Sequence, residues 1–138
     1  MNYHALLDAV GEVATSLGYH PTLHENLHAT LRHEGFPIAV ITPPHLLSVE
    51  GEKEVERVYA LEVKLLVNSG VSRGGRSLKL ATLASDVERL ARALAAHSLV
   101  REVEQQEVAP IEQMLTIAGE VAVRMRAKVR CFECNSEN

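Results

Sequence analysis

The string HENLH, residues 24–28, fits the metal-binding pattern H-E-x-x-H letter for letter. In zinc hydrolases with this pattern, two histidines on one helical face bind zinc and the glutamate acts as general base. Here the segment is short, no third ligand is apparent, and a 138-residue chain leaves little room for a cleft. Seven histidines also make a chance match more frequent. We keep zinc ligation by His24 and His28 as an alternative, and expect no metal, cofactor or catalytic residue.

A second candidate for chemistry is the C-x-x-C formed by Cys131 and Cys134. Such a pair can be half of a zinc site or a redox pair. A second pair of ligands is lacking, and no helix follows the pair, as a redox motif requires. We therefore expect a structural or incidental role. Two cysteines make no disulfide framework, which indicates a chain that folds in the cytoplasm.

The third candidate is a row of cations in GEVAVRMRAKVR, residues 119–130. Apolar residues alternate with this row, which predicts a strand with one apolar and one cationic face. The middle of the chain offers an acidic counterpart. The row and its counterpart comprise Arg124, Arg126, Lys128 and Arg130, and Glu52, Glu54, Glu56 and Glu62.

The cationic row allows three functions: binding nucleic acid, pairing with acids in the same sheet, or joining subunits. A formal net charge of -4, 4% aromatic residues and no Trp argue against a protein that grips phosphates or stacks on bases. We therefore favour pairing, and predict that the eight charged residues form an oligomer interface. On that hypothesis, changing Arg126 to Glu weakens assembly more than folding.

The elements that position these residues belong to one α+β domain. The composition, with 46% hydrophobic and 23% charged residues, is typical of a globular chain. We expect one domain over residues 1–130 and a frayed tail over 131–138. No apolar run approaches the ~20 residues of a membrane span, and the N-terminus lacks the features of a signal peptide.

Apolar periodicity predicts amphipathic helices over residues 3–17, closed by Gly18, and from about Leu78 to His97. Strands are predicted over residues 36–42, 45–50, 53–67, 99–108 and 114–131. Pro43-Pro44 is expected to end the first strand, a turn is expected at residues 50–53, and a polar, mobile loop at 68–77. Residues 19–34 fit either a strand and loop or a short helix. We expect an antiparallel or mixed sheet of four to five strands. Two helices would cover one face, and charges the other.

The order of these elements resembles the tail terminator, or minor tail, proteins of long-tailed bacteriophages and the related head–tail joining proteins. The strings that carry the resemblance are FPIAVIT, EGEKEVERVYALEVKLLV and SDVERLARALAAH, followed by the long alternating strand. The resemblance covers about residues 1–130. The histidine-rich segment, residues 19–34, and the C-x-x-C do not belong to the family pattern.

The resemblance implies a structural virion protein without enzymatic activity, encoded by a phage or prophage. It implies a hexameric homo-oligomeric ring, assembled in the bacterial cytoplasm, that caps the tail tube and terminates its assembly. The expected partners are other copies of the chain, the tail-tube protein and the head connector, with DNA only passing through the lumen and no membrane involved. A zinc-dependent hydrolase and a nucleic-acid-binding protein remain the alternatives.

Overall fold

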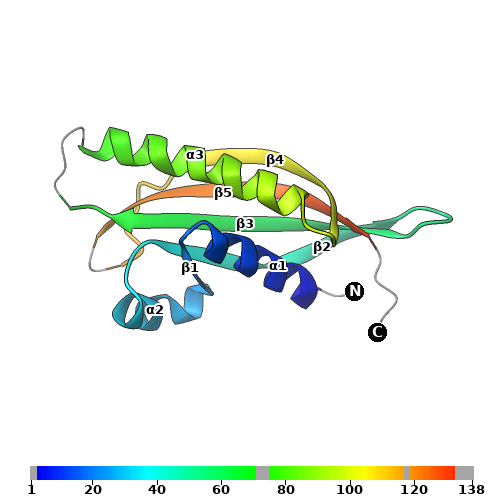
Figure 1. Ribbon diagram of the computed structural model, residues 1–138, viewed down its shortest axis with the longest axis horizontal. Coiled ribbons are helices and arrows are strands. Elements are labelled where there is room, and N and C mark those ends of the chain that lie inside the picture. The colour runs from blue at the N-terminus through cyan, green and yellow to red at the C-terminus, as the bar shows by residue number, and fades with distance from the viewer. Residues whose placement is uncertain (1–2, 71–74, 117–118, 133–138) are drawn as a thin grey trace.

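A five-stranded sheet forms the centre of the computed structural model, which describes residues 3–70, 75–116 and 119–132 (Figure 1). The strand order is β1-β2-β3-β5-β4, with β1 parallel to β2 and the other pairs antiparallel. The strands are β1 (His20–Thr22), β2 (Ile38–Glu50), β3 (Glu56–Asn68), β4 (Val100–Pro110) and β5 (Glu120–Phe132). The helices are α1 (Tyr3–Ser16), α2 (Leu27–His33) and α3 (Gly75–Ala95), with a 3-10 turn η1 (His24–Asn26) before α2. The predicted α+β class with a mixed sheet is confirmed.

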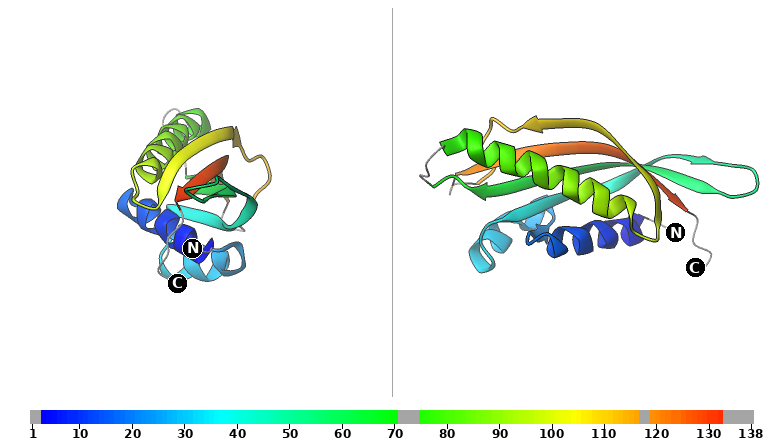
Figure 2. Two further views of the ribbon diagram at one scale, coloured as in Figure 1. Left: turned by 90° about the vertical axis from the view of Figure 1, so that its right-hand side faces the viewer. Right: turned by 45° about the horizontal axis from the view of Figure 1, so that its top comes forward.

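Helices α1 and α3 lie on one face of the sheet and cover the main core (Figures 1 and 2). The predicted apolar faces of the helices and long strands meet there, as the periods of 3.6 and 2 require. This core includes Leu6, Val10, Leu61, Val63, Leu65, Leu83, Val87, Leu90, Leu94, Val123, Met125 and Val129. Gly18 ends α1 with a φ of 91°, as predicted for a left-handed C-terminal glycine.

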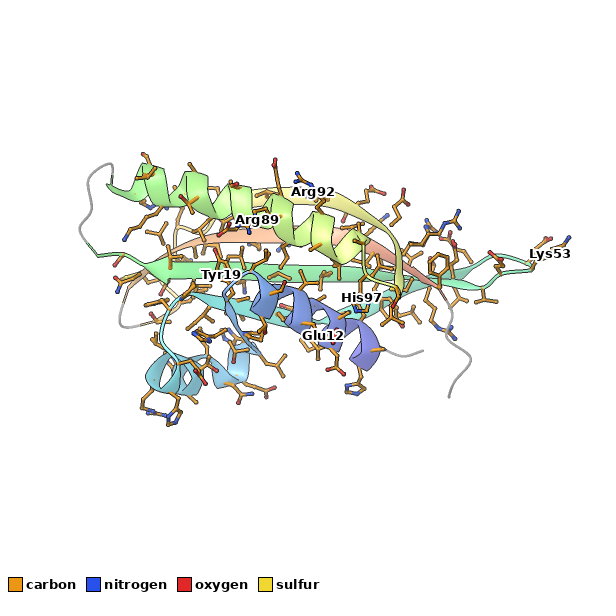
Figure 3. All side chains as sticks on the ribbon, viewed as in Figure 1. Glu12, Tyr19, Lys53, Arg89, Arg92 and His97 are labelled. Atoms are coloured by element: carbon orange, nitrogen blue, oxygen red, sulfur yellow. The ribbon has the colours of Figure 1, made fainter. Side chains whose placement is uncertain are left out.

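Polar contacts join α1 and the segment after it to α3 and the turn after α3 (Figure 3). The Tyr19 hydroxyl donates to Asp86 Oδ2 over 2.6 Å, and His97 Nε2 lies 3.2 Å from Glu12 Oε1. Burial, followed by the hydrogen bond to the Asp86 carboxylate, raises the pKa of Tyr19 well above its ordinary value. These contacts hold the two helices in one layer.

The opposite face is not charged along its whole length, because α2 covers one end of it. Leu27 and Leu31 of α2 pack there on a second apolar cluster. The buried members of that cluster are Leu27, Ile38, Val40, Leu66 and Ala122. Both alternatives for residues 19–34 therefore occur, since β1 and α2 follow one another in this segment. A helix on the second face was not predicted.

Strand β2 is longer than predicted because Pro43 and Pro44 do not end it. The predicted strands over residues 36–42 and 45–50 are one strand, with an irregularity in register between Thr42 and His45. On the outer side, β1 pairs only as far as Val40, so no strand in the described part of the chain needs the missing N–H groups. On the side that faces β3, the register irregularity is a bulge that leaves Pro43 and Pro44 out of the pairing.

The β2–β3 hairpin projects beyond the rest of the molecule, as both side views show (Figures 1 and 2). Its tip is the turn over residues 51–55, where Gly51 has a φ of 100° and an added Cβ would collide with the Glu54 carbonyl oxygen. Strand β3 begins at Glu56, not at Lys53. Glu52 and Glu54 therefore lie in the exposed turn and not on the strand face, contrary to the prediction.

The last strand is shorter at its start than predicted and longer at its end. Residues 111–116 form a loop, in which the Glu120 carboxylate accepts hydrogen bonds from the Leu115 N–H over 2.6 Å and the Thr116 N–H over 3.1 Å. Strand β5 then continues to Phe132, so Cys131 and Phe132 are part of the sheet and not of a frayed tail. Residues 71–74 of the predicted loop and 133–138 of the predicted tail lie outside the described residues.

No helix in the described ranges combines the length and the apolar character needed to cross a membrane.

Candidate functional site

Six of the eight predicted interface residues share the sheet face opposite α1 and α3. The register places Glu62 directly opposite Arg126, and Lys64 opposite Arg124, across β3 and β5. We call this surface the charged face. It comprises the cations Lys64, Arg101, Arg124, Arg126, Lys128 and Arg130, and the carboxylates Glu50, Glu56, Glu62, Glu102, Glu104 and Glu107.

The carboxylates that β4 contributes to this face were not among the predicted interface residues. Arg126 has Glu107 as its cross-strand neighbour in β4, and Lys128 has Glu104. The acidic outer residues of β4 were visible in the sequence. Consecutive strands usually lie next to one another, so the order of β4 and β5 already indicated this pairing.

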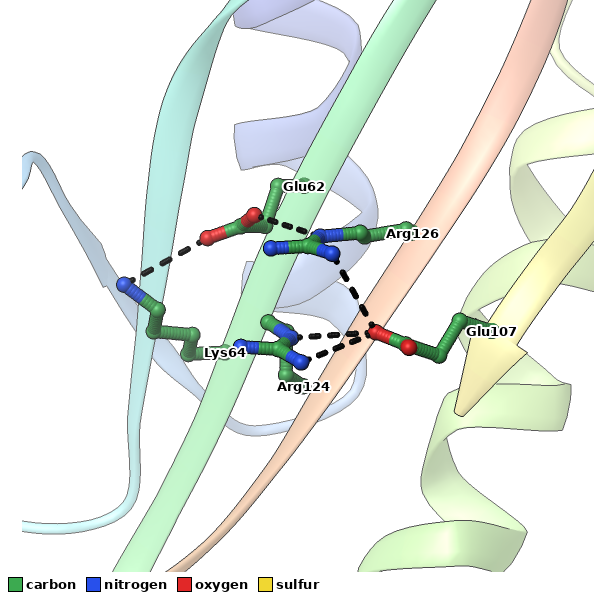
Figure 4. A network of polar contacts seen from close by, with 5 residues as sticks. All are labelled: Glu62, Lys64, Glu107, Arg124 and Arg126. Atoms are coloured by element: carbon green, nitrogen blue, oxygen red, sulfur yellow. Dashed lines mark hydrogen bonds and ion pairs between the residues drawn. The ribbon is translucent and has the colours of Figure 1, made fainter. Parts of the chain in front are cut away.

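Ion pairs within the chain connect the centre of the charged face (Figure 4). Arg126 Nε lies 3.0 Å from Glu62 Oε1, and Arg126 Nη1 lies 3.6 Å from Glu107 Oε1. Arg124 donates to Glu107 Oε1 from two nitrogens, over 2.9 and 3.2 Å, and Lys64 Nζ lies 3.4 Å from Glu62 Oε2. The opposed cations Lys64 and Arg124 are tolerated because each pairs with a different carboxylate.

A second group of ion pairs lies where the hairpin leaves the sheet. Arg130 Nη1 lies 2.6 Å from Glu50 Oε1 and 3.5 Å from Glu56 Oε1. Arg101 also pairs with Glu56, whose side chain is only 10% exposed. Two guanidinium groups therefore compensate a nearly buried carboxylate, which would otherwise be costly to remove from water.

These contacts decide how the cationic row is used. Arg124, Arg126 and Arg130 pair with carboxylates of their own chain. Lys128 is exposed and makes no ion pair among the residues that the structure describes. The charged face carries as many carboxylates as cations, so it presents no unpaired cationic stripe to a phosphate backbone. The pairing needs no second subunit.

The same contacts make folding sensitive to acid through Glu62. Burial alone would raise its pKa, but the hydrogen bond from Arg126 and the charge of Lys64 outweigh burial and lower it below 4.5. The unfolded chain then binds this proton more tightly than the folded chain. The stability that Glu62 contributes is thus complete above pH 4.5 and is lost as the pH falls through the folded-state pKa.

We expect Glu62→Gln to reduce the loss of stability on acidification. Urea unfolding followed by circular dichroism, from about pH 6 down to about pH 3, measures the slope that this linkage predicts. Glu88→Gln, at an exposed carboxylate on α3, is the matched control and should keep the wild-type slope. Equal slopes for wild type and Glu62→Gln would refute the role of this carboxylate.

The HENLH string does not form one continuous helix. His24 and Glu25 lie in η1, and His28 lies in α2, with both histidines exposed. Among the described residues, no group of three or more His, Cys, Asp or Glu side chains is placed to hold a metal ion. The structure therefore adds no third ligand to His24 and His28. The buried member of this segment is Leu27, which anchors α2 to the second cluster.

Cys131 is fully buried in the main core, where β5 passes under the helices. Burial raises the pKa of its thiol to about 12. A thiol in that state is a poor nucleophile and a poor metal ligand near neutral pH. The residue fills the core, in agreement with the structural role expected of it, and Cys134 lies outside the described residues.

Exposed apolar side chains gather at the two ends of the molecule. Leu46, Leu47 and Val49 on the hairpin are 45%, 46% and 53% exposed, and we call them the hairpin patch. At the opposite end, where β2 and α3 begin, lies a groove of about 460 Å³. We call it the end groove; its lining is Phe36, Pro37, Val67, Asn68, Leu78, Lys79 and Thr82. Such exposed apolar clusters are typical of contact surfaces.

No protein-family model matches the sequence, and no curated protein is significantly similar to it. The features that bear on function are therefore the three surfaces defined above. The charged face is neutralised within the chain, whereas the hairpin patch and the end groove expose apolar side chains to solvent. These two surfaces are the candidate functional site.

Proposed function

We propose that the protein is a structural protein that assembles with copies of itself into a ring. In the class that it resembles, the ring forms at the end of a phage tail or at the head–tail junction and terminates assembly of the tail tube. The observation that carries the proposal is the projecting hairpin, with its apolar patch, at one end of a molecule whose other end has an apolar groove.

Contacts between two different surfaces of identical subunits are heterologous, and they build a ring when the rotation between neighbours closes. A patch and a groove at opposite ends are two different surfaces of this kind. A single patch that meets its own copy would instead produce a twofold dimer. The arrangement therefore favours a heterologous contact over a twofold dimer. We propose that this contact closes into a hexamer, as the resemblance implies, with tail-tube and head-connector proteins as partners.

The charged face suits such a ring without taking part in subunit contacts. All of its cations except Lys128 pair with carboxylates of the same face, so a wall made of this face would let DNA slide past without holding it. The alternatives, a zinc-dependent hydrolase and a nucleic-acid-binding protein, gain no supporting contact from the described residues.

Size-exclusion chromatography with light scattering tests the proposal on the full chain. We expect a concentration-dependent oligomer with a mass near six times the 15.1 kDa of one chain, and rings in negative-stain electron micrographs. Assembly should increase when tail-tube protein from the same phage is added. A protein that stays monomeric at all concentrations, alone and with tail-tube protein, would overturn it.

A further inference from the structure

We infer that the hairpin patch of one copy docks in the end groove of the next copy of this chain. This inference rests on the ring proposed above and specifies its contact. The surfaces concerned are the side chains of Leu46, Leu47 and Val49 on one copy, and the groove beside Leu78 on the other.

The hairpin is built to dock through side chains and not by adding a strand. Among the described residues, no strand lies beside the outer edge of β2 beyond Val40, and such an edge invites pairing with another chain. Pro43 and Pro44 lie on that edge, and the register of β2 shifts twice before Val49. Prolines and bulges of this kind block edge-to-edge pairing. The exposed apolar side chains remain as the means of contact.

The end groove offers a surface of matching chemistry. Leu78, on the first turn of α3, is 56% exposed, and it faces Phe36, Pro37 and Val67 across the groove. Exposed apolar side chains of this size gain free energy when a partner removes them from water. The groove is lined by residues next to the start of β2, at the end of β3 and in the first turns of α3. These parts of the elements lie at the end of the molecule away from the hairpin (Figure 1), so one copy cannot fill its own groove.

Charge favours the same arrangement. The hairpin tip carries Glu52 and Glu54 on either side of Lys53, so two carboxylates and one ammonium leave it with a net charge of -1. Neither carboxylate makes an ion pair in the described part of the chain. The groove has Lys79 in its lining, held by hydrogen bonds from Nζ to the carbonyl oxygens of Asn68 over 2.5 Å and Gly70 over 2.8 Å. Arg76, also on α3, does not line the groove and already pairs with Glu112 over 3.4 Å. A tip with a net charge of -1 is attracted to a groove whose one charged lining residue, among those described, is Lys79, whereas two such tips side by side repel each other.

Two single substitutions test whether these surfaces meet. Val49→Asp places a carboxylate on the hairpin patch, and Leu78→Asp places one in the end groove. Both side chains are more than half exposed, so both variants should fold, which circular dichroism verifies. We expect each variant alone to be monomeric. An equimolar mixture should form a one-to-one heterodimer, because Val49→Asp keeps an intact groove and Leu78→Asp keeps an intact hairpin.

Disulfide trapping is a second measurement, which detects the contact even if it is too weak to hold two copies together outside a closed ring. In a Cys134→Ser background, Val49→Cys combined with Leu78→Cys should give a ladder of disulfide-linked oligomers on a non-reducing gel. Each single cysteine variant should give none above the dimer. Cys131 does not interfere in the folded protein because it is buried.

The outcomes separate this inference from the proposed function. If wild type is monomeric, the proposed ring fails and the docking with it. If wild type assembles and Leu78→Asp still assembles, the hairpin contacts some other surface, and the inference is overturned. Assembly of Val49→Asp would exclude the hairpin in the same way. A mixture that stays monomeric, together with no disulfide ladder, would also overturn it.

Discussion

Replacing Leu65 by Ala is expected to lower the free energy of unfolding by about 2–5 kcal/mol, as is typical for a buried leucine. Leu65 is fully buried on β3 beneath α1 and α3. We expect a comparable loss for Leu66→Ala, although Leu66 points to the opposite face, which was predicted to carry charge. Leu66 is also fully buried, in the second cluster under α2. Urea unfolding followed by circular dichroism gives both values.

The two leucines should differ in which part of the fold they loosen. Leu66→Ala removes packing from α2, so a protease should cut near residues 27–33 sooner in this variant than in Leu65→Ala. Met114→Ala is the control, because Met114 is 73% exposed in the loop before β5, outside both proposed contact surfaces, and its truncation should change stability by less than about 0.5 kcal/mol. An unchanged free energy of unfolding in Leu66→Ala would contradict the burial of Leu66 in the second cluster.

Reversing the charge of Arg126 is expected to destabilise the folded monomer. Arg126→Glu would place a carboxylate opposite Glu62 and beside Glu107, the two residues that Arg126 now pairs with. The Arg126 side chain is half exposed, so solvent screens the effect. We expect a loss of about 1–2 kcal/mol in low salt, and less in high salt. Chemical unfolding at low protein concentration measures it.

A charge swap identifies the partner. The double variant Glu62→Arg/Arg126→Glu restores the central pair with its charges exchanged. The introduced arginine then lies beside Lys64, however, and the introduced glutamate lies beside Glu107. Stability should therefore recover only in part. Lys53→Glu, at the hairpin tip in Figure 3, changes net charge by the same amount as Arg126→Glu and should leave unfolding unchanged.

The outcome of Arg126→Glu also discriminates between two positions of the subunit contact. If the charged residues formed the oligomer interface, as the sequence predicts, this substitution would weaken assembly more than folding. With the pairs closed inside one sheet, we expect the reverse: the variant should still assemble wherever it is folded. Loss of assembly with unchanged unfolding would return the contact to the charged face.

The sequence by itself determined which face of each long element is apolar. Alternation in residues 119–130 placed Val123, Met125 and Val129 in the core, because successive side chains on a strand point to opposite faces. The stripe of α3 placed Leu83, Val87 and Leu90 there, because the helical period leaves them on one side. These are local properties of the chain, and the α+β class follows from them.

Tertiary structure alone decided what each face meets. Chain order already indicated that β4 and β5 pair, but Glu62 and Glu107 converge on Arg126 only because β5 also lies beside β3, and that neighbour depends on contacts far apart in sequence. Pro43-Pro44 continues a strand because, within residues 3–70, 75–116 and 119–132, no strand pairs with β2 at that point of its outer edge. In the same way, only the packed molecule sets the hairpin patch and the end groove at opposite ends. Local periodicity fixes the direction of a side chain, whereas its partner depends on which distant segment packs against it.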